Sequence, residues 1–420
     1  MKKKEIIPKI RFKGFTNAWE QEPLRNIVDK YEESIPTPHN GYTRLGIRSH
    51  AKGTFSSYVE KGNELEANKM YKVIAKNLIV NITFAWEHAV AITNEEDSGK
   101  LVSNRFPQFK FHKNVYPYFF KYVILDEHFK HHLLLSSPGG AGRNRVLKID
   151  EMLNYKITIP NLAEQRKIEG FLSKIDKLIS LHQRKCKKLQ NIKKSLLEKM
   201  FPKNNEKFPE IRFKNFTNAW EQESFSNIFD YSIPNNTLSR AELNDEEGII
   251  KNIHYGDILI KYGDVLDISQ NNIPYITNGD FKKYKNYLLK NGDIIFADTA
   301  EDETTGKAIE INNIGNNFVV SGLHTIICRP KQKKQPYYLG YYINSSAYHN
   351  QLLPLLQGIK VYSISKSNLA KTYVRFPIEK REQANIGKLF LKIDKLLSLH
   401  QRQVEKLQNI KKALLEKMFV

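Results

Sequence analysis

The feature of this chain that most constrains its fold is a long internal repeat. The segment IPKIRFKGFTNAWEQEPLRNI at residues 7–27 reappears as FPEIRFKNFTNAWEQESFSNI at residues 208–228. A second repeated segment follows each of them, KIDKLISLHQRKCKKLQNIKKSLLEKMF at 174–201 and KIDKLLSLHQRQVEKLQNIKKALLEKMF at 392–419. The residues in between differ almost completely. The chain therefore contains one large duplication, in which the repeated segments meet the same constraint twice.

The second repeated segment predicts a long helix in each half. Apolar residues recur in steps of four and three from Ile168 to Met200, and again from Ile386 to Met418. This spacing is typical of a coiled-coil seam held over about five heptads, and a proline precedes each helix. Neither helix can bury its stripe alone. Pairing of the two equivalent halves about a two-fold axis predicts an antiparallel coiled coil, with a variable block toward each end.

One polar residue occupies the same seam position in both predicted helices, as His182 and His400. A single buried polar residue often fixes the register of a coiled coil. We favour that interpretation over a pH switch or a metal pair, and no metal site is predicted. The basic residues nearby form either a solvated face or a track for phosphates.

The two variable blocks mix strands with helices, which indicates an α+β fold. The first block, about 28–158, is predicted to contain a helix over 116–137. The second block, about 229–375, is rich in predicted strands, including one over 256–269, and has a helix over 336–357. In both blocks this helix leads through a basic, glycine-started loop into a strand that ends in proline. We therefore expect two similar domains with different surfaces.

These patterns divide the chain into four parts. We predict a first domain with its repeat segment over 1–158 and a long helix with a linker over 159–207. A second domain with its repeat segment follows over 208–375, and a second long helix over 376–420.

The charge of the chain favours a nucleic acid as its partner. The 420 residues carry a formal net charge of +21, and each phosphate that such an excess neutralises releases condensed counterions. Two cysteines exclude a disulfide framework and fit a reducing cytoplasm. The basic start lacks the apolar core of a signal peptide, and no apolar run is long enough to span a membrane.

Two basic loops are the candidate DNA-binding sites, because Arg, Lys, Asn and Ser side chains suit base edges and phosphates. The candidates are Arg143, Asn144, Arg145 and Lys148 in the first block and, in the equivalent loop of the second block, Lys360, Tyr362, Ser363, Ser365 and Lys366. The alternative is that glycine-rich basic loops are mere connectors.

Sequence motifs for catalysis are weak, and no catalytic residue is assigned. The loop GGAGRNR lacks the G-x-x-x-x-G-K-[ST] pattern of a phosphate-binding loop and follows a helix instead of a strand. Asp264, Asp267 and Asp280 faintly resemble a metal-dependent nuclease site, but the first block has no counterpart. A stand-alone nuclease and a coiled-coil adaptor without nucleic acid are the alternatives to a DNA-binding scaffold.

The doubled helices, AEQRKIEGFLSKIDKLISLHQ and REQANIGKLFLKIDKLLSLHQ with their continuations, resemble those of the specificity (S) subunit of a type I restriction–modification enzyme. The motifs YITNGDF, GDIIFADTAEDETTGKAIEI and SGLHTIICRP of the second block add to the resemblance. It covers essentially the whole chain, although the first block lacks a strand of the GDI…A form.

The resemblance implies two target recognition domains that each read one half of a split DNA site, with the helix pair setting the spacer. The repeats would dock two copies of a methyltransferase (modification) subunit, with restriction and translocase subunits outside them. This chain would catalyse nothing, so S-adenosylmethionine, ATP and Mg²⁺ would belong to its partners. Trp19 and Trp220 are candidate docking anchors, because tryptophan is enriched at interface hot spots. The alternative is that both pack within their own domain.

Overall fold

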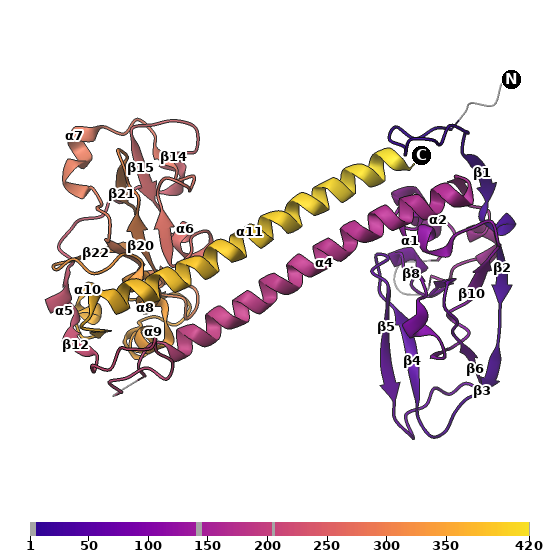
Figure 1. The fold of residues 1–420 in the computed structure, drawn as a ribbon, viewed down its shortest axis with the longest axis horizontal. Helices are drawn as coiled ribbons and strands as arrows, with labels where there is room; N and C mark the ends of the chain where they lie inside the picture. The colour runs from indigo at the N-terminus through magenta and orange to yellow at the C-terminus, as the bar shows by residue number, and fades with distance from the viewer. Residues whose placement is uncertain (1–5, 140–144, 204–205, 420) are drawn as a thin grey trace. The chain divides into compact units, whose positions relative to one another are not determined.

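The computed structural model describes residues 6–139, 145–203 and 206–419 (Figure 1). The contacts divide the chain into unit 1, Met1–Leu181 with Gln403–Val420, and unit 2, His182–Arg402. Each long helix, α4 (Leu162–Lys199) and α11 (Lys380–Met418), therefore contributes one part to each unit. The boundaries predicted at 158 and 375 fall in the last strand of each variable block, just before the long helix.

Unit 1 contains an antiparallel sheet with strand order β2-β10-β7-β8 and a mixed sheet with strand order β3-β6-β9-β4-β5. A further pair of strands, β1-β11, completes it. Its strands are β1 (Glu20–Pro23), β2 (Val28–Tyr31), β3 (Ser34–Pro36), β4 (Tyr42–Ile47), β5 (Thr54–Val59), β6 (Lys69–Lys72), β7 (Asn77–Val80), β8 (Val90–Ile92), β9 (Leu101–Val102), β10 (Gln108–Phe111) and β11 (Lys156–Ile159). Its short helices include η2 (Ala85–Glu87), α1 (Pro117–Val123), α2 (Glu127–Leu135) and α3 (Ile149–Met152).

Unit 2 has sheets with strand orders β13-β22-β18-β20-β16 and β14-β17-β15-β21, and the pairs β12-β24 and β19-β23. Its strands are β12 (Glu221–Ser224), β13 (Phe229–Asp230), β14 (Leu243–Asn244), β15 (Ile250–Ile253), β16 (Val265–Asp267), β17 (Tyr275–Ile276), β18 (Ile294–Ala297), β19 (Thr299–Ala300), β20 (Ala308–Asn312), β21 (Phe318–Ser321), β22 (Thr325–Pro330), β23 (Tyr362–Ser363) and β24 (Tyr373–Phe376). Its helices include α5 (Phe225–Ile228), α6 (Tyr255–Ile260), α7 (Phe281–Tyr284), α8 (Tyr338–Asn344), α9 (Ser346–His349), η6 (Leu353–Leu355) and α10 (Lys366–Leu369).

The two units share their central strand pairings, which confirms the prediction of two similar α+β domains, although their second sheets differ in strand number and order. In each unit the strand of the repeated segment pairs antiparallel with the strand before the long helix, through Glu20 opposite Ile159 and Glu221 opposite Phe376. The strand order β2-β10-β7 of unit 1 likewise matches β13-β22-β18 of unit 2. The duplication seen in the sequence is therefore also a duplication of structure.

Three predicted elements were wrong in detail because polar side chains end or start helices inside them. The helix predicted over 116–137 breaks into α1 and α2, since the Asp126 side chain accepts from the amide of His128 and caps α2. The helix predicted over 336–357 breaks at Ser345 into α8, α9 and η6. The strand predicted over 256–269 begins as helix α6 and becomes strand β16 only at Val265.

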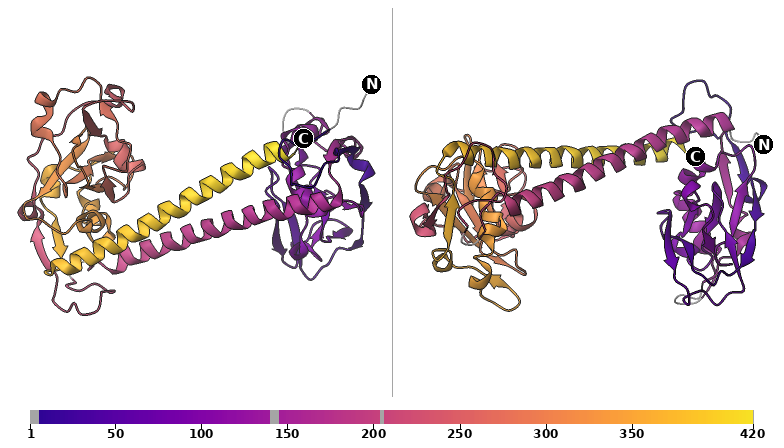
Figure 2. Two further views of the ribbon diagram at one scale, coloured as in Figure 1. Left: turned by 45° about the horizontal axis from the view of Figure 1, so that its top comes forward. Right: turned by 60° about the horizontal axis from the view of Figure 1, so that its bottom comes forward.

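The two long helices pair antiparallel, as predicted. In unit 2, His182 and Phe201 of the first repeat lie against His400 and Phe390 of the second, so the later residues of one segment meet the earlier residues of the other. The ribbons of α4 and α11 accordingly run in opposite directions (Figure 2). In unit 1, Met418 near the end of α11 belongs to the same apolar cluster as Ile168 near the start of α4. The same direction of pairing is thus found in both units.

Burial of the seam depends on what covers it. Ile168 and Leu172 are fully buried in unit 1, and the equivalent Ile386 and Phe390 are fully buried in unit 2, because the sheets and short helices of each unit cover them. Cys186, farther along α4, is only partly buried. In the described part of the chain, no helix is both long and apolar enough to cross a membrane.

Candidate nucleic-acid interface

The two basic loops are anchored at the same place in their units. In unit 1, the amide of Leu147 donates to the carbonyl of Ile82 at 2.9 Å, just after β7. In unit 2, the amide of Ile364 donates to the carbonyl of Asp298 at 2.8 Å, just after β18. Because β7 and β18 are equivalent strands, the loops are equivalent, as the sequence predicted. The segments that surround each loop are different.

In unit 1 the loop lies against η2. The guanidinium of Arg145 is 5.6 Å from the ring centre of Trp86, within the range of a cation–π contact. The turn between β4 and β5 joins the same helix, because the amide of His50 donates to the carbonyl of Glu87 at 2.9 Å. The basic loop and the β4–β5 ribbon therefore border one surface.

The β4–β5 ribbon was missed by sequence reasoning. Its two strands pair over six residues, and a two-stranded ribbon is one of the elements that the major groove of DNA admits. Gly46 lies opposite Phe55 and leaves room for that ring, since a Cβ there would collide with it. The exposed Phe55 is also covered by the guanidinium of Arg48, at 5.2 Å. The sequence signal was Lys52-Gly53 between two β-rich runs.

The predicted unit 1 residues differ in their surroundings. Arg143 and Asn144 lie outside the described residues. Arg145 faces Trp86, as above. Lys148 precedes α3 as its N-cap residue, and its side chain pairs with Glu151 at 3.0 Å on an exposed surface. Its local partner makes Lys148 a weaker candidate than Arg145.

In unit 2 the equivalent loop is a closed turn. Gln357 and Ser363 exchange two backbone hydrogen bonds, at 3.0 and 2.8 Å, and Ser363 also pairs with Thr299 across β19 and β23. Gly358 has φ of +119°, and a Cβ there would collide with the carbonyl of Val361. Only glycine suits this position, so the turn has a fixed shape.

The predicted unit 2 residues are likewise of two kinds. Lys360, Ser363 and Lys366 are exposed on the turn and at the start of α10. Tyr362 is partly buried, and its carbonyl accepts from Thr305. Ser365 caps α10, since its hydroxyl accepts from the amide of Asn368 at 3.2 Å, which gives it a structural role. The exposed lysines are therefore the stronger candidates.

A row of aromatic side chains borders the unit 2 loop. The ring of His324 is 5.2 Å from that of Tyr255, which in turn is 4.6 Å from His254. His324 also lies 3.3 Å from Asp298, the residue that anchors the loop. Burial lowers the pKa of His254, so this ring is neutral at pH 7. His324 follows the end of β21, as expected for a histidine at a strand end.

The three aspartates of the nuclease alternative are engaged separately. Asp264 forms an ion pair with Lys193 at 2.8 Å. Asp267 accepts from Ser269 at 2.6 Å, and Asp280 caps α7. No group of three or more His, Cys, Asp or Glu that could hold a metal ion is found among the described residues. This arrangement gives the nuclease alternative no support.

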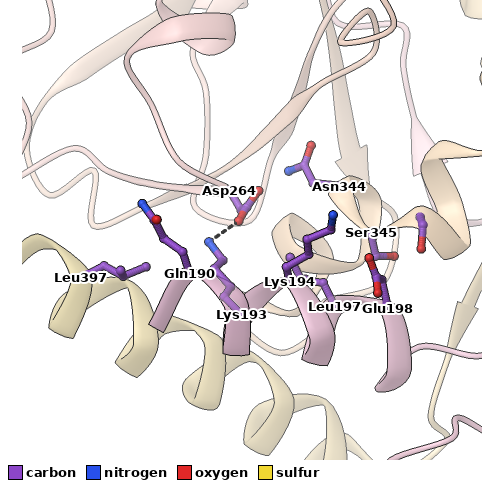
Figure 3. A pocket seen from close by; sticks show the side chains of 10 residues that line it. Gln190, Lys193, Lys194, Leu197, Glu198, Asp264, Asn344, Ser345 and Leu397 are labelled. Carbon is purple, nitrogen blue, oxygen red and sulfur yellow. Dashed lines mark hydrogen bonds and ion pairs between the residues drawn. The ribbon is translucent and has the colours of Figure 1, made fainter. Parts of the chain in front are cut away.

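The Asp264–Lys193 pair borders a cavity of about 480 Å³ between α4 and the sheet domain of unit 2 (Figure 3). Lys193 also contacts Asp394 of α11 at 2.6 Å, and the hydroxyl of Tyr341 donates to Asp394. Burial raises the pKa of Asp264. Unit 1 repeats part of this cluster, with Lys411 paired to Asp176 at 2.6 Å. The cluster joins each domain to both helices.

The repeated tryptophans pack within the chain. Trp19 and Trp220 are 4% and 5% exposed, each with its ring centre 6.2 Å from a phenylalanine, Phe419 and Phe201 respectively. The repeat segments also bond to the helix ends, where Ile10 donates to the carbonyl of Lys417 and Ile211 to that of Lys199. Packing within the chain is thus what the structure shows, and the role of these rings as partner anchors stays a prediction.

The histidines of the seam meet directly. The Nδ1 atoms of His182 and His400 are 3.0 Å apart, so one ring donates a hydrogen bond to the other. Burial, together with His182 and Lys185, lowers the pKa of His400. This contact between equivalent positions agrees with the role in setting register that the sequence favoured.

The two equivalent domains carry unlike loops, and each packs on part of both long helices. The chain belongs to the type I restriction modification DNA specificity domain family, whose model matches residues 49–191 and 192–409. It is accordingly a specificity subunit, the non-catalytic component of that class.

Individual relatives agree with this assignment. The chain is 24% identical to the type I restriction enzyme MjaVIII specificity subunit of Methanocaldococcus jannaschii, over 83% of this chain and 81% of that protein. It is 26% identical to the putative MjaX specificity subunit of the same organism, over 51% of this chain and 48% of that protein, about half its length. The fold is similar to that of a type I restriction-modification S subunit from M. genitalium, with a TM-score of 0.55, 13% identity and 99% coverage of both chains.

Proposed function

We propose that each unit reads one half of a bipartite DNA site through the surface around its basic loop. The observation that carries this proposal is the shared anchor after β7 and β18, which holds two loops of different sequence in equivalent positions. Equivalent placement with different side chains is what two readers of different sequences require. The net charge of +21 supplies the attraction to phosphates.

We further propose that the helix pair sets the number of unread base pairs between the two halves. The support is that α4 and α11 each contribute to both units and pair antiparallel in each. At about 1.5 Å per residue a 38-residue helix is about 57 Å long, which is more than one turn of DNA.

The proposed protein partners are two methyltransferase subunits, with restriction and translocase subunits outside them in the cytoplasm. Each unit exposes the same three apolar helix residues, which are Leu178, Leu181 and Ile410 in unit 1 and Leu396, Leu399 and Ile192 in unit 2. Identical exposed apolar side chains at equivalent positions suit two copies of one partner. S-adenosylmethionine, ATP and Mg²⁺ are proposed to bind those partners.

The decisive experiment is to map methylated adenines across the genome of a host that carries the methyltransferase, with and without this chain. We expect one split motif that appears only when the chain is present. Methylation that does not depend on the chain would contradict the proposal. A coiled-coil adaptor would bind no DNA, whereas a reader with several phosphate contacts loses roughly 10³-fold or more in affinity between 50 and 200 mM salt.

A further inference from the structure

The closed turn of unit 2 presents an isoleucine to solvent. Ile359 is 93% exposed and its neighbour Val361 is 50% exposed. Single exposed apolar residues are common in proteins, so the exposure of Ile359 alone indicates no function. The conformation of the backbone around it is the more informative observation. The two Gln357–Ser363 hydrogen bonds and the conformation of Gly358 fix the turn, and Ile359 therefore stands at the tip of a rigid projection.

The width of this projection determines which groove of DNA it fits. Two paired chain segments lie about 5 Å apart, and their side chains add several ångströms on each side. The minor groove, about 6 Å wide, is too narrow for such a turn, whereas the major groove, about 12 Å wide, admits it. Lys360 beside the tip and Lys366 at the start of α10 are exposed and can reach phosphates.

An apolar side chain has one apolar group to contact on the edges of the bases in that groove, the C5-methyl of thymine. We propose that Ile359 reads a thymine methyl group in the half-site bound by unit 2. This inference rests on the proposed function and makes it specific to one residue and one base. The equivalent loop of unit 1 has the sequence GGAGRNR, without a large apolar residue, so no such contact is expected from that loop.

The test uses duplexes that carry the mapped motif, in which each thymine in turn is replaced by uracil, which lacks only the methyl group. Affinity is measured for the full chain in complex with its methyltransferase. One uracil in the unit 2 half-site should weaken binding by about fourfold, the value of one buried methyl-sized group. The Ile359→Ala variant should bind thymine and uracil at that position equally.

Ile260, which is 90% exposed at the end of α6, provides the matched control. Ile260→Ala should keep the wild-type uracil profile, and equal unfolding midpoints would show that both variants fold. A unit 2 half-site without thymine, or an Ile359→Ala variant that still distinguishes the two bases, would overturn the inference alone. A wild-type complex that selects no motif would overturn the proposed function and this inference with it.

Discussion

Lys193 shows how a single residue can join three elements. Its ammonium group lies between Asp264 of the sheet domain and Asp394 of α11, and its backbone belongs to α4. The equivalent Lys411 has Asp176 as its close partner across the helices. The two clusters therefore differ in sign: one lysine lies between two carboxylates in unit 2, whereas one carboxylate, Asp176, lies between Lys411 and Lys121 in unit 1. The helix sequences that supply Lys193 and Lys411 are almost identical.

Replacement of these lysines should have unequal effects. Lys193→Ala leaves two largely buried carboxylates without a cation, and we expect a loss of about 3 kcal/mol in the free energy of unfolding. Lys411→Ala affects a single carboxylate, Asp176, which keeps Lys121 at 3.7 Å, and we expect about 1 kcal/mol. Urea denaturation of both variants measures the difference. Equal losses would show that Asp264 adds nothing to the cluster.

The histidine pair predicts a dependence of stability on pH. Because burial with His182 and Lys185 lowers the pKa of His400, the unfolded chain binds a proton there more readily than the folded chain. The contribution of the neutral His400 ring to the free energy of unfolding is therefore complete above about pH 6.5, the ordinary pKa of histidine. It is lost as the pH falls below that value. The unfolding temperature of His400→Asn should fall less between pH 7.5 and 5.5 than that of the wild type. Parallel curves would contradict the prediction.

Sequence reasoning worked at the residue scale where the chain repeats itself. It placed His182 and His400 at one seam position, and they touch. It identified Arg145 and Lys360 as cations of equivalent loops, the first partly buried and the second exposed, but Ser365 proved to be a helix cap. Asp264 and Trp86 contact Lys193 and Arg145, which lie far away in the sequence, so no local pattern predicts those contacts.

At the scale of elements, the long helices were predictable because the three–four spacing of apolar residues persists over many turns. The short helices were not, since capping by Asp126 and the break at Ser345 compete with apolar periodicity over only a few residues. The β4–β5 ribbon was also missed. Its identity depends on pairing with a neighbouring strand as well as on local propensity.

The exposed helix residues predict how many partners bind. The paired substitution Leu178→Lys with Leu181→Lys should remove one methyltransferase subunit from the complex, because a charge disrupts an apolar contact in unit 1 only. The matched pair Leu396→Lys with Leu399→Lys should remove the other. Native mass spectrometry of the purified complexes counts the subunits. Retention of both copies by the fourfold variant would place the docking surface elsewhere.

Shortening both helices should change the spacer. Deleting 183–189 together with the equivalent 401–407 removes seven residues, or about 10 Å of helix, from each side while keeping the heptad register. We expect a methylated motif with a spacer shorter by about three base pairs. Deleting 183–189 alone should prevent the Lys193–Asp394 and Lys411–Asp176 pairs from forming together and reduce assembly. An unchanged spacer in the double deletion would argue against a measuring role.

At the scale of the whole molecule, the duplication made the architecture predictable. Two copies of each repeated segment implied two copies of each fold, and the strand pairs Glu20–Ile159 and Glu221–Phe376 agree. What could not be predicted was that each unit incorporates part of both helices. Domain boundaries that are predicted from the sequence divide the chain into consecutive segments. In the structure, residues 1–181 pack with residues 403–420, which are far away in the sequence.

Independence of the two readers can be tested by exchange. Grafting a foreign block into 28–158, with the repeats kept, should change one half of the methylated motif and leave the other half and the spacer unchanged. Sequencing of methylated DNA reports both halves at once. The matched graft into 229–375 should change the other half. A change in both halves from a single graft would contradict the proposal that each unit reads one half of the motif.

The contact of Ile10 with the carbonyl of Lys417 sets an order of events during synthesis. Unit 2 is one continuous stretch, so it can fold as soon as it leaves the ribosome. Unit 1 needs residues 403–419, which emerge only after all of unit 2 has been made. At 5–20 residues per second this is a delay of roughly ten seconds or more. During this time Trp19 lacks its contact with Phe419, and the nascent first domain is accessible to chaperones and proteases.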